Sequence, residues 1–259
     1  MTHQPLDDIP VFLFVALFVL ANLVAYEVGF RVGMWSKRRD PDGDEGPTGM
    51  IVGSILALMA FLLAITMGMA GDRFDTRRGL VLAEANALGT TYLRAGYLPE
   101  AASAEMQELV IEYVPLRIAP SDQAQLAANI QRSEELQAEM WAIAEEVART
   151  DGSDVTALFI ESLNDVIDLH TSRVVAGIYA RVPATILWLL VIGVIISLAL
   201  VGYSAGLGRK RSPAIALVLV LFLGAVIWLV VDLDRPREGL IQVSQQPLID
   251  LQQRLESEP

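Results

Sequence analysis

The chain contains no cysteine and only two histidines, His3 and His170. A chain without cysteine forms neither disulfides nor thiolate metal sites, and two isolated histidines do not build a histidine-rich metal centre. The sequence also lacks a glycine-rich phosphate loop, a nucleophile elbow and a metal-binding loop. We therefore predict no catalytic residue, no metal site and no cofactor, and we do not expect an enzyme.

Charge is almost missing from four long apolar runs, of which only the first contains a charged residue, Glu27. Each run is close to the roughly 20 residues that an α-helix needs to cross the hydrocarbon core of a bilayer. The residues before the first run include Asp7 and Asp8 but no Lys or Arg, unlike the start of a signal peptide. We therefore predict four retained membrane-spanning helices, at about 10–30, 50–70, 183–207 and 213–231.

Positive charge is scarce between the second and third runs, in residues 72–181. Nine arginines and no lysine stand there against eighteen Asp and Glu, a balance of −9 within a whole-chain charge of −12. Binding to nucleic acid depends on basic side chains that displace counterions from phosphate. The composition therefore predicts no nucleic-acid partner.

Strand alternation is also absent from residues 72–181, where apolar residues recur at helical spacing. No break follows the second run, so we expect its helix to continue out of the membrane. The predicted fold class is an all-α membrane protein with four transmembrane helices and a helical extramembrane domain inserted between spans two and three. The predicted domains are a first transmembrane pair (1–71), an acidic helical domain (72–181), a second transmembrane pair (182–231) and a polar C-terminal tail (232–259). The expected core of the helical domain includes Val81, Leu88, Leu109, Met140, Ile143, Leu158 and Val166.

Small residues recur at steps of three and four along the second run, so they share one helical face. Such a face lets another transmembrane helix approach closely. Two interpretations remain open: the face packs inside the four-helix bundle, or it lies toward a symmetry-related copy or a pore. The first run carries a similar pattern that includes Gly29 and Gly33. The residues of the second run are Gly49, Gly53, Ala57, Ala60, Ala64 and Gly68, with Phe61 as the one aromatic residue among them.

Polar residues stand out in three places. Asn22 and Glu27 lie within the first run, where a polar residue is a functional-site hypothesis by default. Two further blocks follow the second and fourth runs, and they emerge on the same side of the membrane because two spans separate them. We expect these blocks to dock, either through Arg73 or Arg77 with Asp232 or Asp234, or through Arg235 with Asp75 or Glu84. We also expect Glu84 and Asn86 to have partners inside the protein. The blocks contain Asp72, Arg73, Asp75, Arg77, Arg78, Glu84 and Asn86, and then Asp234, Arg235 and Pro236.

Three segments carry a family resemblance: DRFDTRR (72–78), EANALGTTYLR (84–94) and DRP followed by GLI (234–241). In these segments, and in span order over most of its length, the chain resembles a family of bacterial membrane proteins described as bestrophin-like. Bestrophins are homopentameric anion channels whose second span lines the pore. The resemblance implies a homo-oligomer, pentameric in bestrophins, with an inorganic ion as ligand and membrane lipid around it. It also implies a pore-facing role for the second span, with Phe61 at a hydrophobic neck.

Two questions stay open at this stage. The positive-inside rule does not decide the orientation of the chain in the membrane. Seven Lys and Arg lie in the short loops, and seven lie near the span ends on the other side. Bestrophin order favours a cytoplasmic helical domain in a bacterial inner membrane. For function, we expect a homo-oligomeric ion channel or pore first, and a scaffold or signalling protein whose helical domain binds a protein partner second. A membrane enzyme using Glu27, Asp75 or Glu84 is the third alternative.

Overall fold

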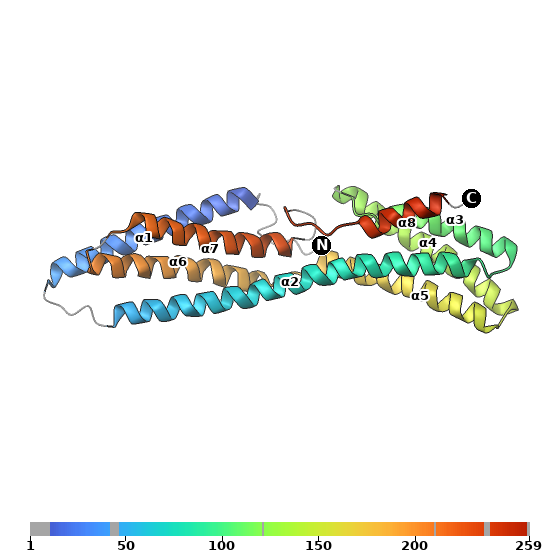
Figure 1. The fold of residues 1–259 in the computed structure, drawn as a ribbon, viewed down its shortest axis with the longest axis horizontal. Helices are drawn as coiled ribbons and strands as arrows, with labels where there is room; N and C mark the ends of the chain where they lie inside the picture. Colours follow the sequence, from blue (N-terminus) through green and yellow to red (C-terminus); the bar gives the residue numbers. More distant parts are fainter. Residues whose placement is uncertain (1–10, 42–46, 121, 210, 236–238, 258–259) are drawn as a thin grey trace. The chain divides into compact units, whose positions relative to one another are not determined.

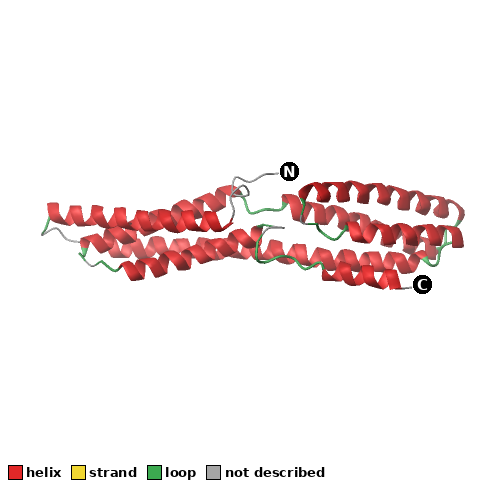
Figure 2. Cartoon of the chain, turned by 90° about the horizontal axis from the view of Figure 1, so that it is seen from above, coloured by secondary structure: helices red, strands yellow, loops and turns green. Residues whose placement is uncertain are grey.

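The computed structural model describes residues 11–41, 47–120, 122–209, 211–235 and 239–257. Within these ranges every regular element is a helix (Figure 2). This confirms the all-α prediction. The chain divides into two compact units: unit 1 comprises residues 1–73 and 181–241, and unit 2 comprises residues 74–180 and 242–259.

Unit 1 contains four helices that are long and apolar enough to cross a membrane, as predicted. They are α1 (Val11–Arg39), the first part of α2 (Thr48–Ala95), α6 (Ala184–Leu207) and α7 (Pro213–Asp234). Helix α2 continues without interruption beyond the apolar run, also as predicted. Helices α1 and α6 lie side by side (Figure 1) and make the most extensive helix contact in the unit.

Glycines bring the backbones of α1 and α6 into contact. A Cβ atom placed on Gly29 would lie 1.9 Å from the carbonyl oxygen of Ala199, and one on Gly202 would lie 2.1 Å from that of Tyr26. Gly33 and Gly206 show the same close approach to the facing helix. The small residues of the first run therefore serve packing within the protomer.

Substituting Gly202 tests this contact. Gly202→Ala adds one methyl group where there is no space, so α1 and α6 must separate, at a cost of about 1–3 kcal/mol. We expect a lower melting temperature in detergent. The matched control is Gly71→Ala, because a Cβ on Gly71 would meet nothing within 4 Å. Equal melting temperatures for the two variants would contradict the close packing.

Unit 2 is a helical bundle. Besides the end of α2 it contains α3 (Glu100–Leu116), α4 (Gln123–Thr150), α5 (Asp154–Val174), the π-helical turn η1 (Val175–Tyr179) and α8 (Gln246–Ser257). Side-chain hydrogen bonds cap the N-terminal ends of two of these helices. Asp122 accepts a hydrogen bond from the backbone N–H of Gln125 at α4, and Ser153 accepts one from that of Thr156 at α5.

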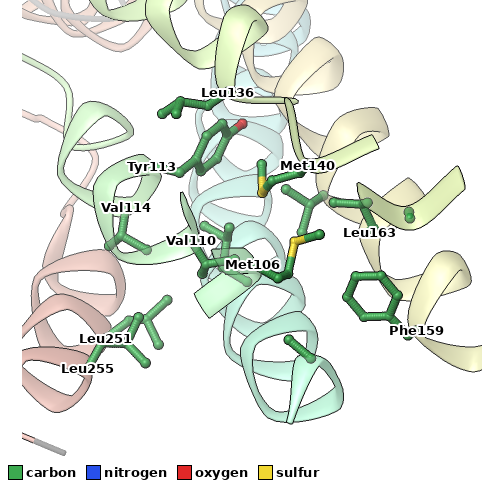
Figure 3. Packing of buried hydrophobic residues seen from close by; sticks show 14 of the residues in the cluster. Met106, Val110, Tyr113, Val114, Leu136, Met140, Phe159, Leu163, Leu251 and Leu255 are labelled. Carbon is green, nitrogen blue, oxygen red and sulfur yellow. The ribbon is translucent and has the colours of Figure 1, made fainter. Parts of the chain in front are cut away.

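The core of unit 2 matches the sequence prediction in part (Figure 3). Val81, Leu88, Met140 and Val166 are buried as predicted, and Leu109 and Ile143 are partly buried against the core. Leu158 is 48% exposed, so that prediction was wrong. The adjacent Phe159 is buried instead, and a shift of one residue turns a helical side chain by about 100°. Core residues outside the expected set include Met106, Val110, Tyr113, Leu136 and Leu163.

The C-terminal segment also differs from the expected polar tail. Its helix α8 buries Leu248, Leu251 and Leu255 in the core of unit 2. Leu251 faces α2 at Gly89, where an added Cβ would lie 3.5 Å from the leucine Cδ1. Three leucines at steps of three and four form an apolar stripe too short to stand out among the surrounding polar residues.

Candidate functional site

The small-residue face of α2 points away from its own protomer. Gly49, Gly53, Ala57, Ala60, Ala64 and Gly68 are all exposed. A Cβ on Gly49, Gly53 or Gly68 would meet no atom of the described residues within 4 Å. The opposite face of α2 is the one that packs, because Met59 is buried and its sulfur would lie 2.5 Å from a Cβ on Gly193 of α6. The sequence left open whether the small-residue face packs inside the four-helix bundle or lies toward another copy or a pore. Its exposure argues against packing inside the bundle.

Phe61 lies among these small residues and is 61% exposed. Its neighbours along the face, Ala57, Ala60 and Ala64, leave its ring as the bulkiest group there. A large apolar side chain surrounded by small ones narrows any space that several copies of this face would enclose.

The polar block that follows divides between the two sides of the helix. Asp72, Asp75 and Arg78 are exposed, whereas Arg77 is buried and Arg73 is partly buried. Glu84 is fully buried, and Asn86 is exposed. The prediction of an internal partner therefore holds for Glu84 but is wrong for Asn86.

Glu84 is the centre of a buried charge cluster in unit 2. It accepts a hydrogen bond from Nε of Arg117 at 2.7 Å and pairs with Arg173 through its other oxygen. Arg173 also donates to the backbone oxygen of Arg117 and, at 3.2 Å, to the side-chain oxygen of Gln245. The cluster joins α2, α3, α5 and the segment before α8. We assign it a structural role.

A second polar cluster lies next to it. Gln137 donates to the hydroxyl of Tyr113 at 2.8 Å, and that hydroxyl lies 3.2 Å from Nδ1 of His170. Burial raises the pKa of Tyr113 to about 12. Burial, reinforced by the positive charge of Arg117, lowers the pKa of His170 to about 4. Both side chains are therefore neutral at pH 7.

The low pKa of His170 predicts a pH-dependent stability. An unfolded histidine titrates near 6.5, so neutral His170 stabilises the fold fully above about pH 6.5, and this stabilisation is lost as pH falls toward 4. We expect wild type to lose thermal stability over this range more steeply than His170→Gln, by up to about 1.4 kcal/mol per pH unit. Melting curves in detergent from pH 7.5 to 4 test this. Parallel curves for the two proteins would contradict it.

Two carboxylates in the last turn of α7, Asp232 and Asp234, both in unit 1, accept hydrogen bonds from neighbouring segments. Asp232 accepts hydrogen bonds from the backbone N–H groups of Leu240 and Ile241. Gly239 has a φ of 135° and approaches Asp232 so closely that a Cβ would lie 2.6 Å from its Oδ1. Asp234 accepts from Arg181 at 2.9 Å and from the backbone of Val182 at 2.7 Å. Arg235 is buried, and Pro236 lies outside the described residues.

The partners of Asp234 and Glu84 were missed by sequence reasoning because Arg181, Arg117 and Arg173 stand far away along the chain. The one available signal was an acidic residue set among apolar ones. Docking of the two blocks through Arg73 or Arg77 with Asp232 or Asp234, or through Arg235 with Asp75 or Glu84, stays a prediction.

The intramembrane polar residues both have partners in unit 1. Asn22 is fully buried and donates to the backbone oxygen of Phe18 at 2.8 Å. Glu27 pairs with Arg31 at 2.9 Å and with Arg211, just before α7, at 2.7 Å. Among the described residues no group of three or more His, Cys, Asp or Glu is placed to hold a metal ion.

Unit 2 also has a polar groove of about 580 Å³ between α2 and α5. Asn86 and Thr90 line it from α2, and Glu161, Asp165 and Asp168 line it from α5. These carboxylates are exposed, and the one arginine in the lining, Arg94, donates to the backbone oxygen of Leu158. The groove therefore presents three carboxylates beside apolar residues such as Ala87 and Leu169.

Comparisons with known proteins agree with this architecture. A family model described as a Bestrophin-like domain matches residues 13–248. The chain is similar in structure to a bacterial bestrophin homologue from Klebsiella pneumoniae carrying a single substitution, with a TM-score of 0.70 and 13% identity over 93% of this chain and 97% of that one. A second variant of that homologue gives 0.67 and 14% over 98% and 96%. No curated protein sequence matches the chain. At these identities the structural likeness establishes the fold alone.

Proposed function

Because this multi-pass membrane protein belongs to the bestrophin-like family, we propose that it is a homo-oligomeric ion channel whose pore is lined by α2. The observation that carries the proposal is the exposed small-residue face of α2, which has no partner within the described part of unit 1. Transmembrane helices associate through such faces. Several copies of the chain supply the partner that one copy lacks.

A single protomer has little space between its helices for an ion-conduction path of its own. The backbones of α1 and α6 touch at Gly29, Gly33, Gly202 and Gly206. A pore shared between copies avoids this restriction, and closed cyclic symmetry is the usual form of a homo-oligomer. Bestrophins assemble as pentamers, and we propose the same number here.

Within the shared pore we assign the narrowest point to Phe61. A ring of exposed phenylalanines among alanines forms a hydrophobic constriction, which gates by excluding water. The outward apolar side chains of α1, α6 and α7 then contact membrane lipid. The helical domain is proposed to face the cytoplasm of a bacterial inner membrane, following bestrophin order.

A scaffold or signalling role is the second candidate. It is favoured by apolar side chains exposed on unit 2, where Leu93 is 66% and Tyr97 is 73% exposed. Large apolar side chains exposed on a surface are among the groups that protein contacts bury. In an oligomeric channel the same side chains contact a neighbouring copy.

Two measurements on the purified protein test the proposal together. Its mass in mild detergent should correspond to a closed ring, and the same preparation should carry unitary ion currents in planar bilayers. A monomer, or an oligomer silent over a range of pH, salts and calcium, would contradict the channel and leave the scaffold role.

A further inference from the structure

Two arginines from distant parts of unit 1 share one carboxylate near the end of α1. Nε of Arg31 lies 2.9 Å from one oxygen of Glu27, and a terminal nitrogen of Arg211, just before α7, lies 2.7 Å from the other. The side chain of Glu27 is 30% exposed, whereas those of Arg31 and Arg211 are 75% and 57% exposed. One negative charge therefore holds two positive charges close together at the surface.

These arginines lie at the end of an outward apolar stripe. Val24, Val28 and Val32 are exposed and recur every four residues along α1, so they share one side of the helix. Arg31 follows Val28 by three residues and lies on the same side. The proposed function places this side of α1 against lipid. A long arginine side chain near the end of a span extends toward the lipid headgroups.

An aromatic residue marks the headgroup region one turn later. Trp35 follows Arg31 by four residues and is 54% exposed. The guanidinium of Arg39 lies over its ring, 4.0 Å from the ring centroid. Tryptophan is enriched at the boundary between membrane and water. Trp35 therefore places Arg31 and Arg39 at the depth of phospholipid headgroups.

Positive charge exceeds negative charge at this end of unit 1. The described residues there include six basic side chains and two acidic ones, Glu27 and Asp40. Adding Lys210 and the three acids of residues 42–46, which lie outside the described residues, gives seven basic against five acidic. A net positive surface attracts anionic headgroups more than zwitterionic ones, whose own positive group it repels. The six described basic residues are Arg31, Lys37, Arg38, Arg39, Arg209 and Arg211.

We propose that Arg31 and Arg211 bind the phosphate of an anionic phospholipid, with Trp35 and Arg39 beside the headgroup. Each arginine contacts Glu27 through one of its three nitrogens, so the other N–H groups of both guanidiniums can donate to phosphate oxygens. A phosphate held in this way links α1 to the loop before α7. This site rests on the proposed function only in placing the outward side of α1 against lipid, and it does not depend on conduction.

Native mass spectrometry of the purified full-length protein in neutral detergent measures this binding. The probes are phosphatidylglycerol and phosphatidylcholine with the same acyl chains. We expect wild type to bind phosphatidylglycerol more tightly than phosphatidylcholine, and Arg31→Gln/Arg211→Gln to bind phosphatidylglycerol at least about tenfold more weakly. The matched control is Arg149→Gln/Arg254→Gln, which removes two exposed arginines from unit 2 and should keep the wild-type affinity.

A second variant covers a failure of the first to fold. Glu27→Gln/Arg31→Gln/Arg211→Gln removes all three charges together, so it leaves no carboxylate without a partner, and it should bind phosphatidylglycerol as weakly as the double variant. Equal affinities of wild type for the two lipids would overturn the preference for an anionic headgroup. Wild-type phosphatidylglycerol affinity in a folded arginine variant would overturn the site. Because binding is measured without current, neither result bears on whether the protein is a channel.

Discussion

Ala57→Trp is expected to abolish ion currents. Ala57 lies in the middle of the exposed small-residue face of α2, and the bulk of tryptophan there either separates neighbouring copies or fills the pore between them. We expect current in planar bilayers to fall at least tenfold. The mass in mild detergent distinguishes the two routes, because a blocked pore keeps the oligomer and a disrupted interface loses it.

The matched control is Val218→Trp on α7. Val218 is 67% exposed in the protomer. In the proposed channel this side faces lipid, where tryptophan is accommodated. Normal currents and a normal oligomer mass for Ala57→Trp would contradict the assignment of α2 to the pore lining.

Glu84→Ala is expected to unfold unit 2. Glu84 has no exposed surface and pairs with both Arg117 and Arg173, which are themselves nearly buried. Removing one partner of a buried ion pair costs about 3–5 kcal/mol, because the remaining charge is left without compensation. The expected result is a large loss of thermal stability, or no folded protein.

A compensated variant tests the cause of this loss. Replacing the whole cluster by apolar residues, Glu84→Leu with Arg117→Met and Arg173→Met, removes the buried charges together and should recover much of the stability. The matched single control is Glu161→Gln, an exposed carboxylate of the same unit. A triple variant as unstable as Glu84→Ala would contradict the explanation by uncompensated charge.

The membrane-spanning architecture could be predicted because it depends on local signals. Run length and the absence of charge define the four spans, and helical periodicity without strand alternation defines the all-α class. The long α2 followed from the absence of any break after Ala70. These features need no knowledge of which helix contacts which.

The direction of each small-residue face could not be predicted. Glycines and alanines recur at the same spacing on α1 and α2, yet Gly29 packs against α6 and Gly53 faces outward. The sequence pattern encodes the capacity for close approach and does not encode the partner. The partner of each face is determined by how the helices pack in the folded protein.

Long-range polar contacts were missed for the same reason. Glu84 bonds to residues 33 and 89 positions away, and no local pattern pairs it with Arg117 rather than with Arg77. The burial of Arg77 beside the exposed Asp75 is likewise a property of the folded helix.

Accessibility of single cysteines on α2 tests the central claim most directly. Because the chain has no native cysteine, Ala64→Cys and Val218→Cys each introduce one unique thiol. If α2 lines the pore, a charged water-soluble thiol reagent should rapidly change the current of oligomeric Ala64→Cys and leave that of Val218→Cys unaltered. Currents that persist unchanged in Ala64→Cys during full exposure to the reagent would contradict a pore lined by this face.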